Sequence, residues 1–350
     1  MSEPMRDCLA PAPKAWPSSL LSAQHVYRSL ADANLPDEPL LHWDDLADRE
    51  DMPDASSGGS AWQISALEAS RRWANPVIFR QSPQGQIAFS LSRTGKALKL
   101  QAWEAHWKFA SPLLGEAAVD LLVETVSDLR QRLPDVPISI EVSGLPAGKP
   151  PKALTRRFEP FSWRQHFSHA AASLDGGMDG WLSRRSAGFR RSLWRARSHA
   201  EAAGLTFERC APTTQGGAGE AYARMLSVER LSWKGQCRSG LIAVQGFYGA
   251  LVRRYAPHKQ ARIIFARQGE RDVGFCFGGL VGRSYRGQQT SYAEDVATLS
   301  VGNLMHVETA RWLCDEGARF QHFGPLQPGL DYKARFCELK PRSFILQLLA

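Results

Sequence analysis

The sequence of 350 residues has no long apolar run and little organised cysteine. No stretch of about 18 consecutive apolar residues occurs, which argues against a membrane-spanning helix. The first residues lack the apolar core of a signal peptide, so we expect a cytoplasmic protein. The 6 cysteines include no C-x-x-C pair, and no H-x-x-x-H or H-x-H spacing is present. We therefore expect neither a metal site nor a disulfide framework.

The composition is that of a globular chain with length enough for two domains. It is 43% hydrophobic, 10% aromatic and 22% charged, with a formal net charge of +8. The charge is uneven: residues 1–60 hold four basic and eleven acidic side chains, a net of −7, so residues 61–350 carry +15. A body this basic points to an anionic partner, which can be a nucleic acid, a membrane surface or a phosphorylated small molecule.

Residues 1–60 predict a separate acidic, proline-rich extension. One helix is expected around 20–33, and a Ser-Ser-Gly-Gly-Ser linker covers 56–60. Between them, the stretch 37–54 carries eight acids against a single arginine. Such a stretch stays solvated unless a basic surface receives it, so a flexible appendage and a docked arm both stay open.

Residues 61–165 predict a small α/β domain. Its expected order is an amphipathic helix over 64–73, hairpin strands within 76–104, a helix over 117–133 and a strand over 137–146. The helix over 117–133 has the clearest periodicity. Its expected buried stripe consists of Leu121, Leu122, Val126 and Leu129.

Residues 166–350 predict a second α/β domain. It opens with a helix over 180–203, and a meander of three strands follows over 261–296. The strand–helix junction then leads into a helix over 301–316, and the last strand is expected over 343–349. The predicted fold class is therefore α/β with mixed sheets.

The helix expected over 180–203 carries arginines with no acid between them. They are Arg184, Arg185, Arg190, Arg191, Arg195 and Arg197. Because i,i+4 ion pairs are missing, these side chains need water or an anion. The face is either solvated, a site for the phosphates of a small ligand or for an anionic acceptor, or a site for an RNA backbone. Trp181 and Trp194 flank the arginines.

The junction at Ser300, Val301, Gly302 and Asn303 is a candidate anion site. Free N–H groups at a helix start, approached through a glycine, suit a pyrophosphate. The alternative is an ordinary helix with Ser300 as its N-cap.

Two histidines and one cysteine near this junction are candidates for chemistry. His306 and His322 are candidate bases because a neutral imidazole accepts protons near pH 7. For each, the alternative is a structural histidine. Cys314 lies beside Leu313 in an apolar setting, which favours a core thiol over a nucleophile.

Several segments together resemble a known family. They are WLSRRSAGFRRSLWRARSHAEAAGLTFER, ERLSWKGQCRSG, GFYGAL, VGFCFGGL, SVGNLMHVETARWLCDEG and FGPLQPGLDYKARFCE. They resemble the CelD-like (BioF2-like) branch of the GNAT acyltransferases, relatives of the Fem aminoacyl transferases. The resemblance covers about residues 61–348, and its first part is similar to the degenerate first domain of that branch. It implies two tandem GNAT-like domains, the first degenerate, after an N-terminal extension.

The resemblance also implies an activity. An acyl-CoA is the expected co-substrate, without a metal, and the acceptor is an amine or hydroxyl of a small molecule, peptide or glycan precursor in a direct ternary complex. The Fem relationship implies charged tRNA as an alternative donor. A catalytically inactive GNAT scaffold that binds a partner is the third alternative. Only SVGNL stands where many GNAT enzymes have a Q/R-x-x-G-x-G/A loop.

The resemblance carries over particular residues. The pyrophosphate-binding turn would comprise Ser300, Val301, Gly302, Asn303 and Leu304. The catalytic candidates are Tyr332, Lys333 and Asp295, and the substrate-binding candidates are Trp233, Lys234, Arg190, Arg191 and His322. Tyr332 would protonate the leaving thiolate, while Lys333 would polarise the carbonyl or hold an acidic acceptor. The alternatives are a solvated surface loop for this pair and a core position for Trp233.

Overall fold

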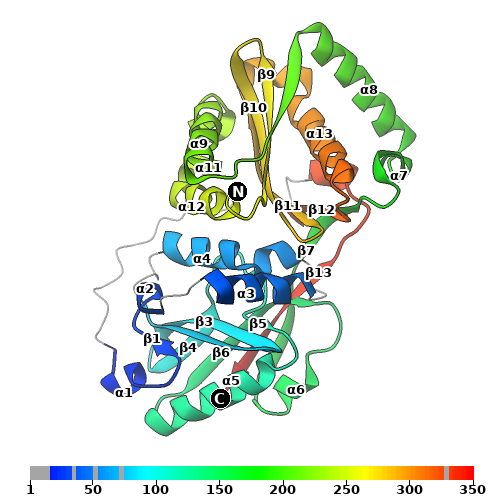
Figure 1. Cartoon of the computed structure of the whole chain (residues 1–350). Helices are drawn as coiled ribbons and strands as arrows, with labels where there is room; N and C mark the ends of the chain where they lie inside the picture. Colours follow the sequence, from blue (N-terminus) through cyan, green and yellow to red (C-terminus); the bar gives the residue numbers. More distant parts are fainter. Residues whose placement is uncertain (1–15, 34–36, 50–53, 71–74, 327–330) are drawn as a thin grey trace. The chain divides into compact units, whose positions relative to one another are not determined.

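The computed structural model of the chain describes residues 16–33, 37–49, 54–70, 75–326 and 331–350 (Figure 1). These residues form two compact units. The N-terminal unit comprises the described residues up to Ser168 together with Pro341–Ala350, and the C-terminal unit comprises those within His169–Lys340. No described helix combines the length and apolar character needed to cross a membrane.

The N-terminal unit contains a mixed sheet. Its strands are β1 (Val26–Tyr27), β2 (Val77–Ser82), β3 (Gly85–Thr94), β4 (Ala97–Ala102), β5 (Leu113–Leu114), β6 (Ile138–Pro146), β7 (Phe161–Ser173) and β13 (Arg342–Leu349). The order is β1-β2-β3-β4-β6-β13-β7, and β5 pairs with β3. Only β4 and β6 pair in parallel; the other described pairs are antiparallel.

Helices cover both faces of this sheet. They are α1 (Ser18–Leu21), α2 (Leu30–Ala33), α3 (Asp37–Arg49), η1 (Ala55–Gly58), α4 (Ser60–Ala69), α5 (Ala118–Arg132) and α6 (Lys152–Thr155). Alternation along β2 separates two cores: Val77 and Phe79 pack with α3 and α4, whereas Ile78 packs with α5. The predicted stripe of α5 is buried, as its period requires.

The described part of the N-terminal extension is docked in the N-terminal unit. Trp43 of α3 is only 1% exposed, and its Nε1 donates to the Gly58 carbonyl oxygen at 2.7 Å. The Ser60 N–H donates to Asp44 Oδ1 at 2.7 Å. The expected linker over 56–60 is thus a buried turn, whose small residues let α3 approach closely. A flexible appendage is wrong for these residues.

The single helix expected around 20–33 is also wrong. The chain instead forms α1, the two-residue strand β1 and α2. His25, directly before β1, has a φ of 61°, which an α-helix does not accommodate.

The C-terminal unit contains a second mixed sheet. Its own strands are β8 (Leu205–Cys210), β9 (Ala261–Gln268), β10 (Arg271–Val281), β11 (Ser284–Tyr292) and β12 (Phe320–Leu326). With the residues of β7 after Ser168, the order is β7-β12-β11-β10-β9-β8. The predicted meander of β9, β10 and β11 is antiparallel, whereas β11 and β12 run parallel. The predicted α/β class with two tandem units is confirmed.

Two helical layers flank this second sheet (Figure 1). One layer contains α9 (Gln215–Arg230), α10 (Trp233–Gln236), α11 (Gly240–Ala243) and α12 (Gln245–Tyr255). The other contains α7 (Gly177–Ser183), α8 (Ala187–Ala202) and α13 (Val301–Asp315), and the short helices η2 (Glu294–Leu299) and η3 (Asp331–Arg335) lie in loops. Buried side chains of α7, α8 and α13 share their cores with the sheet.

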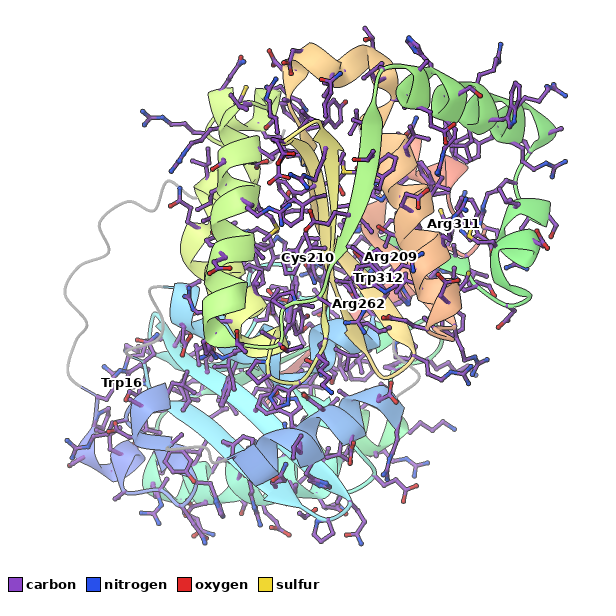
Figure 2. The ribbon with its side chains drawn as sticks, turned by 45° about the horizontal axis from the view of Figure 1, so that its top comes forward. Trp16, Arg209, Cys210, Arg262, Arg311 and Trp312 are labelled. Atoms are coloured by element: carbon purple, nitrogen blue, oxygen red, sulfur yellow. The ribbon has the colours of Figure 1, made fainter. Side chains whose placement is uncertain are left out.

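Helix α13 is anchored by an aromatic clamp. The ring of Trp312 has the guanidinium carbons of Arg209 and Arg262 at 5.7 and 5.3 Å from its centre (Figure 2). Arg209 pairs with Asp315 at 2.8 Å, and Arg262 pairs with Glu316 at 2.7 Å. These contacts from β8 and β9 fix the far end of the helix whose beginning is the candidate anion site.

Three local predictions need correction. The helix expected over 180–203 is broken into α7 and α8, because Ser186 caps α8 by accepting the Phe189 N–H. The third meander strand ends at Tyr292, so the residues up to 296 belong to the following turn and η2. The last strand, β13, pairs with β6 and β7 in the N-terminal unit, although the sequence analysis placed it in the second domain.

Candidate active site

The sheet of the C-terminal unit opens between β11 and β12. The two strands pair over three residues each, 284–286 with 320–322, although both continue further. Gly324 of β12 has a φ of +85°, and Pro325 has no N–H to donate, so regular pairing cannot continue. We call the parted segments, 287–292 of β11 and 323–326 of β12, the splay.

A β-bulge marks the point where β11 enters the splay. Against β10, Gly287 pairs with Gly278 and Gln289 pairs with Phe277, which leaves Gln288 as the extra residue. The Gln288 side-chain nitrogen is buried and has no hydrogen-bond partner among the described residues. Bulges of this kind redirect a strand and are common beside active sites.

Lys234 lies on the β11 side of the splay. It belongs to α10, a short helix that Ser232 caps through the Gly235 N–H. The Lys234 Nζ donates to the Thr290 carbonyl oxygen at 2.7 Å and to Gln289 Oε1 at 3.4 Å. Because β12 no longer pairs with β11 here, the ammonium group satisfies a carbonyl that has lost its strand neighbour.

Lys333 and Arg286 meet on the β12 side. The Lys333 Nζ donates to the Pro325 carbonyl oxygen at 3.3 Å. A Cβ atom at Gly324 would lie 3.6 Å from Lys333 Nζ and 3.1 Å from Arg286 Nη2. Arg286 is buried, and its Nε donates to the Gly287 carbonyl oxygen at 3.2 Å. The missing side chain of Gly324 therefore leaves room for two cationic groups beside one point of the splay.

The pKa values of Lys333, Lys234 and Arg286 are all lowered at this place. Burial, followed by the charges of Arg286 and Lys234, lowers the pKa of Lys333 from 10.5 to about 7. Burial also lowers the pKa of Lys234, against the opposing charge of Glu229, and lowers that of Arg286 to about 9. Neither lysine forms an ion pair with a described residue.

Tyr332 lies beside Lys333 at the edge of the splay. The residue is 43% exposed, and burial, above all, raises the pKa of its hydroxyl. Tyr292 also contributes to this rise. A Cβ atom at Gly302 would lie 3.0 Å from the Tyr292 ring. Tyr292 therefore connects the surroundings of Tyr332 with the beginning of α13.

The beginning of α13 is not capped in the ordinary way. Ser300 holds the N-cap position with a φ of 55°, and its side chain makes no capping hydrogen bond. The first N–H groups of the helix thus lack the side-chain acceptor that a regular N-cap supplies. Among the predicted turn residues, Val301 and Leu304 are buried in the core, while Gly302 and Asn303 are half-buried.

His306 and His322 are buried near these groups. Burial, then Lys333 and Lys234, lowers the pKa of His306 to about 3, and burial with Arg286 lowers that of His322 to about 3. Imidazoles with so low a pKa are weak bases at neutral pH. Their surroundings fit the structural alternative given for both residues.

The remaining predicted site residues lie apart from this cluster or at its rim: Asp295, Trp233 and the arginines of α8. Asp295 is exposed in η2, where Arg271 pairs with it at 2.6 Å and holds the pKa of its carboxyl below the usual range. Trp233 is 54% exposed, so the core alternative for it is wrong. Arg190 and Arg191 are exposed on α8, in the helical layer opposite Lys234.

Other residues of the site escaped the sequence analysis. Arg286 was overlooked although it is the one cation in the strand SYRGQQTSY, which is a usable signal. Glu229 is buried behind α10, where its Oε1 accepts the Leu241 N–H at 2.7 Å. The Gln289 side chain donates to the Tyr248 hydroxyl at 2.7 Å, a contact that no local pattern announces. No cluster of three metal-ligating side chains occurs within the described ranges.

The unit is thus an α/β domain whose two central parallel strands part beside a helix beginning, with cationic groups along the opening. Residues 187–334 match the family model described as an acetyltransferase (GNAT) domain. The match lies within the C-terminal unit and covers fewer than half of the residues of the chain. No curated protein matches the sequence.

Solved structures share the fold of most of the chain. A conserved protein of unknown function from Bacteroides thetaiotaomicron is 8% identical, with a TM-score of 0.63 over 90% of this chain and 98% of that one. FemX is 9% identical, with a TM-score of 0.59 over 89% and 96%. The C-terminal domain of a putative lysylphosphatidylglycerol synthetase from Agrobacterium fabrum is 13% identical, with a TM-score of 0.55 over 89% and 91%. The predicted GNAT-like fold is thus confirmed for residues 187–334, and the likeness to FemX is one of fold; the narrower CelD-like assignment stays a prediction.

Proposed function

We propose that this protein transfers an acyl group from an acyl-CoA to an amine, or to a hydroxyl, of a second substrate at the splay. The observation that carries the proposal is the interrupted pairing of β11 and β12, with Lys333 and Tyr332 at its edge. The GNAT match over residues 187–334 supports the reaction class. We place the reaction in the cytoplasm, where acyl-CoA is made and used.

The donor would bind with its pyrophosphate at the beginning of α13. The uncapped N–H groups after Ser300 and the partial positive charge of a helix start favour a phosphate there. Gly302 lets the chain pass close to the Tyr292 ring, at the end of the strand that borders the splay. A thioester extended from this point would reach the splay between the parted strands.

The reaction would proceed by direct attack. The acceptor nitrogen forms a bond to the thioester carbonyl carbon, and the carbon–sulfur bond then breaks. The Lys333 ammonium group stabilises the oxyanion of the tetrahedral intermediate. The Tyr332 hydroxyl gives its proton to the leaving thiolate and takes up the proton that the amine loses, so the protons balance. A raised pKa keeps this hydroxyl protonated at neutral pH.

Calorimetric titration with acetyl-CoA and longer acyl-CoAs tests the donor assignment. We expect saturable binding that weakens in Gly302→Val, because a side chain there would clash with the Tyr292 ring. Gly219→Val, on a helix surface with open space around the glycine, is the matched control. If no acyl-CoA binds, this version of the proposal is wrong.

A second candidate is the transfer of an aminoacyl group from charged tRNA. It is favoured by one specific observation: on α8, Arg190, Arg191 and Arg195 form no ion pair with a described residue, and Trp194 between them is 72% exposed. Exposed arginines around an aromatic ring suit a nucleic acid backbone and a stacked base. Binding without any transfer activity would instead favour the inactive scaffold.

A further inference from the structure

Glu229, near the end of α9, is the buried centre of the turn that carries Lys234. Its side chain is 0% exposed, and Oε1 accepts the Leu241 N–H at 2.7 Å, at the start of α11. Its main-chain carbonyl oxygen accepts the Ser232 hydroxyl at 2.8 Å and the Ser232 N–H at 3.0 Å. Ser232 in turn caps α10. Glu229 thus binds both ends of the segment 232–241, and Lys234 lies within that segment.

Two glycines allow this turn to close against Glu229. A Cβ atom at Gly235 would lie 2.1 Å from the Glu229 carbonyl oxygen, and one at Gly240 would lie 2.1 Å from Glu229 Oε1. The Cβ atom at Gly240 would also lie 3.1 Å from Lys234 Cδ, and Gly240 has a φ of +61°. The space that Gly240 leaves open is therefore shared by the Glu229 carboxylate and the stem of Lys234.

The Lys234 ammonium group connects this turn with the splay. Its bonds to the Thr290 carbonyl oxygen and to Gln289 Oε1 hold two consecutive residues of the parted segment of β11. The Gln289 side chain also donates to the Tyr248 hydroxyl of α12 at 2.7 Å. A continuous path of contacts thus runs from Glu229 through Lys234 to the parted strand.

The charge of Glu229 acts along the same path. It opposes the burial that lowers the pKa of Lys234, and Cys276 of β10 acts in the same direction as Glu229. Lys333 of η3 and the neutral His306 of α13 also lie within reach of the Lys234 charge. Glu229 Oε2 is buried and has no hydrogen-bond partner among the described residues. The carboxylate therefore favours the ammonium form of Lys234, which is the stronger donor to the two oxygens on β11.

Building on the proposed acyl transfer, we propose that Glu229 is a positioning residue, which fixes Lys234 on the Thr290 carbonyl oxygen and so holds the β11 side of the splay in place for the thioester. Glu229 touches neither substrate in this arrangement and acts through Lys234. Loss of either side chain frees the Thr290 carbonyl, so β11 is no longer held beside the reacting group. A misplacement of about 1 Å at a reaction centre can cost about 100-fold in rate.

The first test measures the ionisation of Lys234 and needs no substrate. In protein labelled with 13C at the lysine Cε, the Lys234 resonance is assigned by its absence in Lys234→Arg. Glu229→Gln keeps an oxygen for the Leu241 N–H but removes the charge, so Lys234 should lose its proton at a lower pH than in the wild type. Glu220→Gln, at an exposed position of α9, is the matched control and should leave the titration unchanged. Equal titrations in Glu229→Gln and the wild type would overturn the inference.

The second test measures acyl transfer as a function of pH. Lys234→Met should lower kcat by roughly 10- to 100-fold with little change in the Kd of acyl-CoA, because the donor's phosphates would bind at α13. In Glu229→Gln, kcat relative to the wild type should fall as the pH rises, because Lys234 loses its proton earlier. The double variant Glu229→Gln/Lys234→Met should lose no more than Lys234→Met alone. Losses that multiply in the double variant would show that Glu229 acts independently of Lys234 and would contradict the inference.

Hydrogen exchange separates this inference from the proposed function. If the wild-type protein transfers no acyl group, acyl transfer is wrong as its function, but the hold on β11 is still measurable. The amides of residues 287–292 should exchange faster in Lys234→Met than in the wild type, whereas those of β9 should not. The same variant serves if Glu229→Gln does not fold. Unchanged exchange over 287–292, or an equal increase in β9, would count against a positioning role.

Discussion

Lys333 has surroundings that make its charge depend on pH in the neutral range. Positive groups reach it from several elements: Arg286 from β11 and Lys234 from α10, while the buried His306 of α13 stays neutral. Cys337 exerts the opposite, raising effect. Because its pKa is lowered to about 7, the side chain is an ammonium group below that pH and increasingly a neutral amine above it.

If the Lys333 ammonium group stabilises the oxyanion, kcat/KM should fall as the pH rises through about 7. In Lys333→Arg, the guanidinium stays charged, so the remaining activity should lose this fall. The pH profile of acyl transfer with a saturating donor measures both. A wild-type profile that rises through the same range would instead identify Lys333 as the base that takes the proton of the amine.

Tyr332 offers a second test at the level of one atom. Tyr332→Phe removes only the hydroxyl, and general acid catalysis is typically worth about 100- to 10,000-fold in rate. We expect kcat to fall within that range while the Kd of acyl-CoA changes little. The control is Tyr222→Phe, whose hydroxyl on α9 donates to the Gln245 carbonyl oxygen away from the splay. Comparable losses in both variants would count against a role for Tyr332 in proton transfer.

Regular helices could be predicted from the local sequence pattern, whereas the breaks between them could not. Helices α5 and α13 could be predicted within one residue at each end, because apolar side chains recur at the helical period and Gly317, with a φ of +71°, ends α13. At the break before α8, which Ser186 caps, Arg185 turns inward and pairs with Glu338 at 2.5 Å, 153 residues later in the sequence. No local window contains that partner.

The candidate site shows the same limit. Tyr332 and Lys333 are neighbours in sequence, so the resemblance could indicate them together. Arg286 joins Lys333 only because Gly324, on another strand, leaves the space between them open. The bond from Lys234 to the Thr290 carbonyl likewise depends on the end of strand pairing, which is a tertiary property.

A loop of the N-terminal unit is organised around one buried carboxylate. Glu104 accepts the backbone N–H groups of Trp107 at 2.5 Å and Phe109 at 3.1 Å. Burial raises its pKa from 4.5 to about 7, against the effect of these hydrogen bonds. The folded protein thus holds more protons at Glu104 than the unfolded chain between about pH 4.5 and 7, so this group's contribution to the free energy of unfolding falls as pH rises through that window.

Glu104→Gln should lower the free energy of unfolding by about 1–3 kcal/mol, because an amide NH2 would face backbone donors in place of an acceptor. It should also flatten the pH dependence between 4.5 and 7. Urea unfolding at several pH values measures both effects. The control is Glu116→Gln, an exposed position before α5. Parallel stability curves for wild type and Glu104→Gln would contradict the raised pKa.

At the scale of the whole molecule, the excess of positive charge is concentrated in specific places. Of the six arginines that the sequence grouped together, three have carboxylate partners: Arg184 and Arg185 pair with Glu338, and Arg197 pairs with Glu201 and Glu308. The unpaired group is smaller than the sequence indicated and belongs to α8. Its exposed face is the surface on which tRNA binding is to be tested.

If α8 binds tRNA, Arg191→Glu/Arg195→Glu should weaken binding strongly at low salt and reduce the slope of log affinity against log salt by about two. Trp194→Ala should weaken binding with little change in that slope, because stacking is not ionic. Filter binding over a salt series measures both. The double variant Arg156→Glu/Arg157→Glu, at two exposed arginines of the N-terminal unit, makes the same charge change elsewhere. Equal effects of the two double variants would leave only a general dependence on net charge.

The acidic segment before residue 60 belongs to a core, which changes how its role can be tested. Trp43 packs against Phe79 and Trp103, with ring centres 5.7 and 5.2 Å away. A deletion of residues 1–55 would therefore expose this cluster instead of merely removing a negative charge. Loss of ligand binding in such a deletion would not distinguish a charge effect from unfolding.

Point substitutions on α3 test whether this segment belongs to the core. Trp43→Ala should lower the free energy of unfolding by about 3–5 kcal/mol, since it leaves a large cavity and removes the donor to the Gly58 carbonyl. Leu41→Ala, at a position 52% exposed on the same helix, should cost less than about 1 kcal/mol. Denaturant melts followed by tryptophan fluorescence and far-UV circular dichroism measure the difference. If Trp43→Ala is as stable as Leu41→Ala, the segment is not part of the core.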